Sequence, residues 1–165
     1  MEMPLSKPVT VRLAQGDERE HYISLFEECG LDVYYMRMES NDNKYVVYVA
    51  EDASGTIVGA LEGTFDAGYP DDVPPGVEMP QAWLSNLGVL PDNRRQNVGR
   101  MLVHRFAQDA TARGLTYVAG LPDQHTDDQG RLGFFERCGL TVITSDSDPG
   151  KAVGGYLQDV LRLTS

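Results

Sequence analysis

The stretch from Trp83 to Gly114 constrains the fold more than any other part of the sequence. Apolar residues from Trp83 to Leu90 form a strand-like run that stops at Pro91, and apolar residues then recur with helical spacing from Val98 onward. The residues between these runs form a basic segment. They are Arg94, Arg95, Gln96 and Asn97, followed by Val98, Gly99 and Arg100 at the start of the helical pattern. The stretch therefore predicts a buried strand, a loop and a helix that ends near Gly114.

This loop has the chemistry of a phosphate-binding site. The first N–H groups of a helix have no intrahelical partner and lie at the positive end of its dipole, so a diphosphate there accepts several hydrogen bonds. Arg94 and Arg95 add positive charge, and Gly99 lets an oxygen atom come close to the backbone. A surface turn with solvated arginine side chains is the alternative interpretation of the loop taken alone.

The run from Val89 to Leu102 resembles the acyl-CoA motif of the GCN5-related N-acetyltransferase (GNAT) family, R/Q-x-x-G-x-G/A. Arg94 matches its first position and Gly99 its last, whereas Asn97 stands where the first glycine is expected. Asparagine tolerates a left-handed backbone better than other non-glycine residues, so the turn can still form. The resemblance implies that the loop amides hold the diphosphate of coenzyme A. It also implies that three strand residues pair with the pantetheine arm: Leu87, Gly88 and Val89.

A second segment, from Gly130 to Leu140, resembles the closing helix and turn of the same family, A-x-x-x-Y-E-K-x-G-F. Phe135 occupies the position where many members carry a tyrosine that protonates the leaving thiolate. A phenyl ring cannot donate a proton, so the resemblance implies another donor, water, or a weak or lost transfer activity. Asp128 falls where the family often has an asparagine that contacts the pantetheine. Together the two motifs and their surroundings cover residues 45–165.

The predicted elements follow the order strand, helix, two paired strands, strand, helix, strand, helix and two strands. Together with the resemblance, this order implies an α+β fold (α/β three-layer) in which a mixed central β-sheet is flanked by helices. A chain of 165 residues is expected to form one domain, 1–165. The expected elements outside the central stretch are strands at Val9–Ala14, Tyr45–Ala50, Thr56–Leu61, Leu115–Leu121, Leu140–Thr144 and Gly155–Leu163, a helix from Gly16 to Cys29, and a short helix or loop at Leu31–Lys44.

The composition excludes some partners. A formal net charge of -11 argues against direct nucleic-acid binding and suits a cationic acceptor, although an acidic surface also simply keeps a protein soluble. No apolar stretch is long enough to span a membrane and no signal peptide is visible, so we expect a cytoplasmic protein without membrane contact. Cys29 and Cys138 belong to no Cys/His cluster, which predicts buried thiols and no metal site.

Two residues are candidates for proton transfer. Glu62 follows the predicted strand Thr56–Leu61, and if it faces the cleft it can accept a proton from an acceptor ammonium, directly or through water. If it faces outward it is only a solvated strand end. His125 is a histidine near the expected cleft that can act as base or acid, because its unperturbed pKa lies near 6.5, or it can be an idle loop residue.

The central strand itself carries no carboxylate, although several members of the family place their base there. Ser85 and Asn86 occupy these positions and can orient an amine or hold a water, but neither is a base at neutral pH. The acidic, proline-rich segment Phe65–Pro80 is expected to be a long loop, because its prolines exclude a helix or a central strand. It either receives a cationic acceptor or is a solvated insertion.

The resemblance implies an acyl-CoA-dependent N-acetyltransferase that moves an acetyl group from acetyl-CoA to a primary amine by direct attack in a ternary complex. Acetyl-CoA (coenzyme A) would be a co-substrate, and no metal is expected. The acceptor would be an amine on a small molecule or a protein, and a homodimer is compatible with folds of this type. The alternative is a catalytically weak acyl-CoA-binding sensor or interaction module, which Phe135 and the missing strand carboxylate favour.

Overall fold

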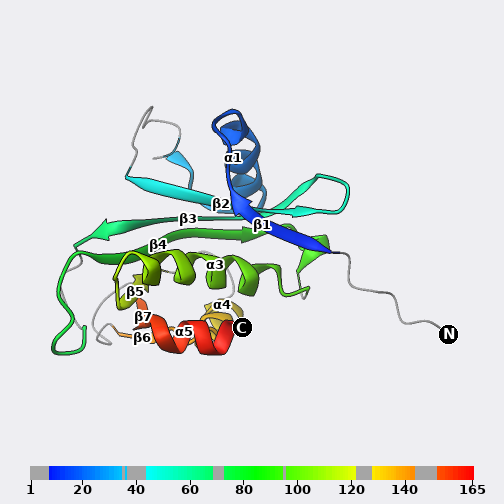
Figure 1. The fold of residues 1–165 in the computed structure, drawn as a ribbon. Helices are drawn as coiled ribbons and strands as arrows, with labels where there is room; N and C mark the ends of the chain where they lie inside the picture. Colours follow the sequence, from blue (N-terminus) through cyan, green and yellow to red (C-terminus); the bar gives the residue numbers. More distant parts are fainter. Residues whose placement is uncertain are drawn as a thin grey trace.

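The computed structural model describes residues 8–34, 36, 44–68, 73–94, 96–121, 128–143 and 152–165, with the backbone alone for 128–131. Within this part of the chain, seven strands form one mixed sheet in the order β1-β2-β3-β4-β5-β7-β6 (Figure 1). Every neighbouring pair is antiparallel except β4 and β5, which are parallel. The strands are β1 (Val9–Leu13), β2 (Tyr45–Asp52), β3 (Ile57–Ala67), β4 (Gln81–Val89), β5 (Tyr117–Gly120), β6 (Thr141–Val142) and β7 (Val153–Tyr156).

Helices cover both faces of this sheet and confirm the three-layer α+β fold. Helix α1 lies on one face, against β3 and β4, and α3 lies on the other face with α5 packed beside it (Figure 1). A short 3-10 turn, η1, leads into α1, and a second one, η2, follows β4. The bounds are η1 (Gly16–Glu18), α1 (Arg19–Glu28), η2 (Pro91–Asn93), α3 (Val98–Ala112), α4 (Asp128–Arg137) and α5 (Leu157–Thr164).

Each face of the sheet buries its own core. Successive strand residues point to opposite faces, so β3 contributes Leu61 to the core under α3 and Ala60 to the core under α1. Phe106 of α3 and Phe26 of α1 are almost fully buried in these two cores. The alternation places Glu62 on the α1 face of β3, the same face as Ala60.

Strand β3 is longer than the sequence predicted. The expected end at Leu61 and the expected loop start at Phe65 are wrong, because the strand continues to Ala67. The Phe65 ring stacks on Phe106 with 5.1 Å between centroids, and the neighbouring Thr64 is buried, so this segment gains burial as a strand. Glu62 therefore lies within the strand and not at its end. Of the remaining predicted loop, residues 73–80 contain no helix or strand, and 69–72 lie outside the described residues.

The C-terminal segment is also different from the prediction. The run Gly155–Leu163 was expected to be a strand, but β7 ends at Tyr156 and α5 begins at the next residue. Buried residues of α5 recur at spacings of three and four, which is helical periodicity: Leu157, Val160 and Thr164. This face of α5 packs against α3, where the Nδ1 atom of His104 and the Oγ1 atom of Thr164 are 2.8 Å apart.

Candidate functional site

Strands β4 and β5 separate in the middle of the sheet. Their parallel pairing spans three positions and ends at Leu84 and Gly120, where β5 stops, whereas β4 continues to Val89. Within the described residues, the backbone beyond Leu84 therefore has no strand beside it on the β5 side. Such an edge offers N–H and C=O groups to an extended ligand. The three residues predicted to pair with pantetheine lie on this edge: Leu87, Gly88 and Val89.

The turn after β4 leads into α3 through Asn97, the position where the sequence allowed a left-handed turn. Asn97 is the N-cap of α3 and has a left-handed backbone, with φ 64° and ψ 14°. Its side chain makes no capping hydrogen bond, and its carbonyl accepts from the N–H of Met101. The N–H groups of Val98, Gly99 and Arg100 therefore receive no side-chain cap from Asn97 and can donate to an anion.

Side chains of the loop complete this arrangement. Arg94 donates from Nε to the carbonyl oxygen of Val89 at 3.0 Å, which ties the loop to the end of β4. Arg94 and Arg100 are both exposed, and Arg95 lies outside the described residues. The Oε1 atom of Gln96 is buried and has no hydrogen-bond partner in the described structure. A buried acceptor without a donor is unfavourable, so a ligand with N–H or O–H groups fits this loop.

Gly99 has a packing role that the motif does not reveal. A Cβ atom at this position would lie 3.1 Å from the Cζ atom of Phe134, closer than ordinary contact. Helix α4 therefore packs directly on the first turn of α3, and the ring of Phe134 needs the glycine. The diphosphate role of the residue and this packing role are compatible, because one concerns its N–H and the other its missing side chain.

Two predicted site residues have side chains outside the described residues: Asp128 for the coenzyme and His125 for proton transfer. Asp128 is the first residue of α4, not a residue ahead of the helix as expected, and its side chain is outside what the structure describes. His125 also lies outside the described residues. The described part of the site therefore combines free helix-start amides at α3, exposed arginines and a strand edge beyond Leu84 that pairs with no described strand.

Glu62 has a neighbour that the sequence did not pair with it. Asn86 lies directly opposite Glu62 in the β3–β4 ladder, and its Nδ2 atom donates to Oε1 of Glu62 at 3.1 Å. Glu62 is 9% exposed, so this carboxylate is largely withdrawn from water. Of the two alternatives that the sequence left open, the solvated strand end is therefore excluded.

Helix α1 supplies the groups that face this pair. Burial raises the pKa of Tyr22, the positive charge of Arg19 opposes that rise, and the negative charge of Glu62 adds to it. Tyr22 thus lies within electrostatic reach of Glu62. On β2, the residue opposite Glu62 is the apolar Val47. The carboxylate therefore lies among an amide of β4, a tyrosine of α1 and an apolar residue of β2.

Phe135, at the position of the expected tyrosine, lies in the core under α3 and is 8% exposed. Its ring offers no proton to a leaving thiolate. Cys138, one turn later, is buried, and this burial raises the pKa of its thiol to about 11. Cys29 is buried as well, so the prediction of buried free thiols is confirmed for both cysteines.

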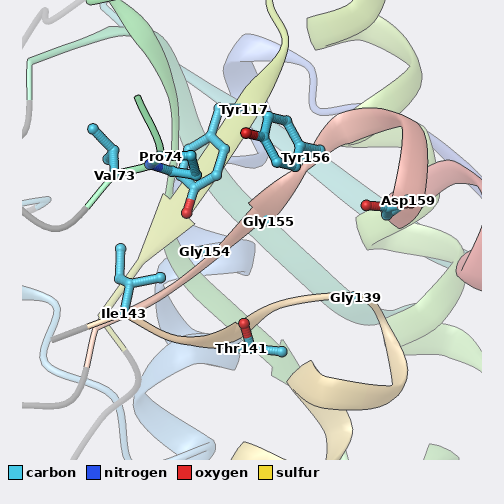
Figure 2. Close-up of a pocket in the computed structure, with 10 residues that line it drawn as sticks. All are labelled: Val73, Pro74, Tyr117, Gly139, Thr141, Ile143, Gly154, Gly155, Tyr156 and Asp159. Atoms are coloured by element: carbon cyan, nitrogen blue, oxygen red, sulfur yellow. The ribbon is translucent and has the colours of Figure 1, made fainter. Parts of the chain in front are cut away.

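A separate hollow of about 570 Å³ lies over β5, β6 and β7 (Figure 2). The rings of Tyr117 and Tyr156 meet edge to face on one side of it, with centroids 5.6 Å apart. Tyr117 is the first residue of β5, whereas the separation from β4 begins beyond Gly120, the last residue. The tyrosine pair of the hollow therefore lies at the end of β5 away from the separation of β4 and β5.

The described residues contain no group of three or more histidine, cysteine, aspartate or glutamate side chains that could hold a metal ion. No helix in this part of the chain is both long and apolar enough to cross a membrane.

Comparison with protein families identifies the class to which this fold and site belong. Residues 12–140 match the acetyltransferase (GNAT) family model. The match covers well over half of the chain, so the chain belongs to the GNAT acetyltransferase family. A search of curated proteins finds no match.

Solved structures agree with this assignment at the level of the fold. The aminoglycoside antibiotic 6'-N-acetyltransferase AAC(6')-Ih from Acinetobacter baumannii superposes with a TM-score of 0.68 at 17% identity, covering 86% of this chain and 96% of its own. The PaiA N-acetyltransferase from Thermoplasma acidophilum, solved in complex with coenzyme A, gives 0.64 at 14% identity, covering 90% and 99%. The spermidine/spermine N-acetyltransferase SpeG from Vibrio cholerae gives 0.65 at 14% identity, covering 95% and 98%.

Proposed function

We propose that this protein is an acyl-CoA-dependent N-acetyltransferase that moves an acetyl group from acetyl-CoA to a primary amine by direct attack in a ternary complex. One observation carries the proposal: the edge of β4, which pairs with no described strand beyond Leu84, continues through η2 and a loop to the start of α3, where Asn97 makes no side-chain cap. These are the two features that a long ligand with a diphosphate group requires. Membership of the GNAT acetyltransferase family supports the same ligand.

In this proposal the coenzyme is held by main-chain groups of consecutive segments. The edge residues Leu87, Gly88 and Val89 pair with the pantetheine arm, and the N–H groups at the start of α3 donate to the diphosphate. Arg94, Arg95 and Arg100 add positive charge at the loop. Gln96, through its buried Oε1 atom, accepts a hydrogen bond from the ligand. Asp128 remains a proposed pantetheine contact.

The chemical step needs a neutral amine, and Glu62 is the proposed base. Its carboxylate takes a proton from the acceptor ammonium, directly or through one water, and the freed lone pair attacks the thioester carbonyl. The new C–N bond forms, the C–S bond breaks, and the second proton that the nitrogen loses is carried through water to the departing coenzyme A thiolate. His125 is kept as a proposed second proton-transfer group. Positioning the two reactants supplies most of the rate, since aligned reactants can gain roughly 7–11 kcal/mol.

Because residue 135 is a phenylalanine, the coenzyme A thiolate has no side-chain proton donor at this position in the proposed scheme. A free thiol has a pKa of about 8.5, so a thiolate is a tolerable leaving group at neutral pH and can take its proton from water. The reaction then proceeds without a side-chain acid at residue 135. Protonation of Glu62 then lowers the rate at low pH.

The acceptor is proposed to be a cationic amine on a small molecule or a protein. The net charge of -11 favours the approach of cations. AAC(6')-Ih and SpeG are named for an aminoglycoside antibiotic and for spermidine and spermine, which are cationic amines. No nucleic-acid surface is proposed.

The test is release of free thiol from acetyl-CoA by the purified protein in the presence of a panel of amines: polyamines, aminoglycosides, amino acids and lysine peptides. We expect release that depends on one amine class and an N-acetyl product detectable by mass spectrometry. Acetyl-CoA binding without release by any class would contradict the transferase.

A second candidate is a catalytically weak acyl-CoA-binding sensor, which the buried phenyl ring of Phe135 favours. It predicts tight binding of acetyl-CoA together with a rate of thiol release that no amine increases. The amine panel therefore separates the two candidates.

A further inference from the structure

We infer that Asn86 is the positioning residue of Glu62, a role that the bulge at Ser85 makes possible. The inference rests on the proposed function, in which Glu62 receives the proton of the acceptor amine. It concerns a contact between two strands that the coenzyme motif does not include.

The bulge decides which way Asn86 points. The β3–β4 register passes from Glu62↔Asn86 to Gly63↔Leu84, so Ser85 is an extra residue in β4. Leu84 and Leu87 both pack in the core under α3, although residues three apart in a regular strand face opposite sides. The extra residue corrects this parity and places Asn86 on the α1 face with Glu62. Without the bulge, the amide would point into the apolar core.

The contact also fixes the orientation of the amide. An ionised carboxylate has only acceptor atoms, so the NH₂ group of Asn86 must face Glu62 and its Oδ1 atom must be on the other side. Oε1 of Glu62 is thereby the oxygen that Asn86 holds. Asn86 lies two residues beyond Leu84, the last β4 residue paired with β5. The Glu62–Asn86 pair therefore lies next to the point where β4 and β5 separate, which is where the thioester is proposed to lie.

The donated hydrogen bond favours the ionised form of Glu62, which is the form a base needs. Tyr22 of α1 interacts with the charge of this carboxylate, and the β2 neighbour Val47 carries no titratable group. Burial raises the pKa of the Tyr22 phenol, so this group stays neutral in the range where a carboxylate titrates. A change in the titration of Glu62 on substitution of Asn86 therefore reports on this contact.

The first experiment is a double-mutant cycle of Glu62→Gln and Asn86→Ala on kcat as a function of pH. Loss of a hydrogen bond to a charged group shifts a pKa by about one unit, so Asn86→Ala should move the acidic limb of the kcat profile up by about one pH unit. Below that limb kcat should fall about tenfold, with KM for acetyl-CoA unchanged. In the Glu62→Gln background, the same substitution should change kcat less than about twofold, because the residue acts through Glu62.

A full tenfold effect of Asn86→Ala in the Glu62→Gln background would overturn the inference, since Asn86 would then act independently. Wild-type kcat in Glu62→Gln would remove Glu62 as the base, and the inference with it.

A second measurement does not depend on activity. The pKa of the Glu62 carboxyl is followed by ¹³C NMR in the wild-type protein, in Asn86→Ala and in the control Asn93→Ala. Asn93 lies in η2, away from Glu62. The pKa should rise about one unit in Asn86→Ala and stay constant in Asn93→Ala. An unchanged pKa in Asn86→Ala would overturn the inference. If the wild-type protein transfers no acetyl group, the proposed function fails, and this titration still decides whether Asn86 controls Glu62.

Discussion

The start of α3 and the Glu62–Asn86 pair are the two halves of the candidate site, and they are built in different ways. The coenzyme half uses backbone amides of consecutive residues, so it depends on loop conformation more than on side-chain identity. The acceptor half uses two side chains that are 24 residues apart in the sequence, and it depends on strand register. Substitutions should therefore affect one half without the other, and the predictions below test that separation.

The largest effect on acetyl-CoA binding is expected from Gly99→Glu. A Cβ atom would press on the ring of Phe134, and a carboxylate would compete with the diphosphate for the helix start. We expect acetyl-CoA affinity, measured by calorimetry, to fall more than about 100-fold, which corresponds to about 2.7 kcal/mol. Gly16→Glu is the matched control, because nothing lies within 4 Å of a Cβ there, and it should keep wild-type affinity. Tight binding in Gly99→Glu would place the diphosphate elsewhere.

Glu62→Gln should affect the other half alone. Removing a general base costs about 10²–10⁴-fold in rate, so kcat should fall in that range and the acidic limb of its pH profile should disappear. Acetyl-CoA affinity should be unchanged. Asp66→Asn is the control, since Asp66 is exposed on the same strand. A full wild-type pH profile in Glu62→Gln would remove this residue from the chemistry.

Gly63→Ala should lower stability without reaching the coenzyme loop. The added Cβ atom would lie 2.6 Å from the ring of Phe106, so we expect the free energy of unfolding to fall by about 1–3 kcal/mol. Gly68→Ala, where a Cβ meets nothing within 4 Å, is the control for denaturant unfolding. Equal stability of the two variants would contradict the packing of β3 on α3.

The smallest effect is expected at Asn97. Because its φ is positive, Asn97→Gly removes strain and should keep stability within about 0.5 kcal/mol and acetyl-CoA affinity within a few-fold. Asn97→Val is the contrasting variant, since a β-branched side chain in this conformation should cost about 1–2 kcal/mol. Equal unfolding curves for Asn97→Gly and Asn97→Val would show that the left-handed turn is absent in solution.

The difference between the coenzyme half, which is built from consecutive residues, and the acceptor half, which is built from distant strands, also explains what the sequence could predict. The loop and the helix start at Val98 were predictable because their signals are local: a proline, a basic run and a change of period. The mixed sheet followed from the family resemblance together with the order of the elements. The glycine contact with Phe134 and the Glu62–Asn86 bond were not, because each depends on how distant segments pack. The bulge at Ser85 leaves no mark in a single sequence, and it changes the face of every residue after it.

The prediction at α5 was wrong for a different reason. Its spacing of Leu157, Val160 and Thr164 was visible in the sequence, but the whole run Gly155–Leu163 was assigned to a strand. The long β3 was missed for another reason: Phe65 continues the strand through its stacking on Phe106, a tertiary contact.

The most direct test of the coenzyme site is an NMR titration of the ¹⁵N-labelled protein with acetyl-CoA, followed through backbone amide signals. We predict the largest shifts at residues 87–89 and 96–100, with little change at Tyr117 and Tyr156 beside the hollow in Figure 2. Shifts confined to that hollow, or no shifts at millimolar acetyl-CoA, would contradict the assignment of the β4 edge and the start of α3 as the coenzyme site.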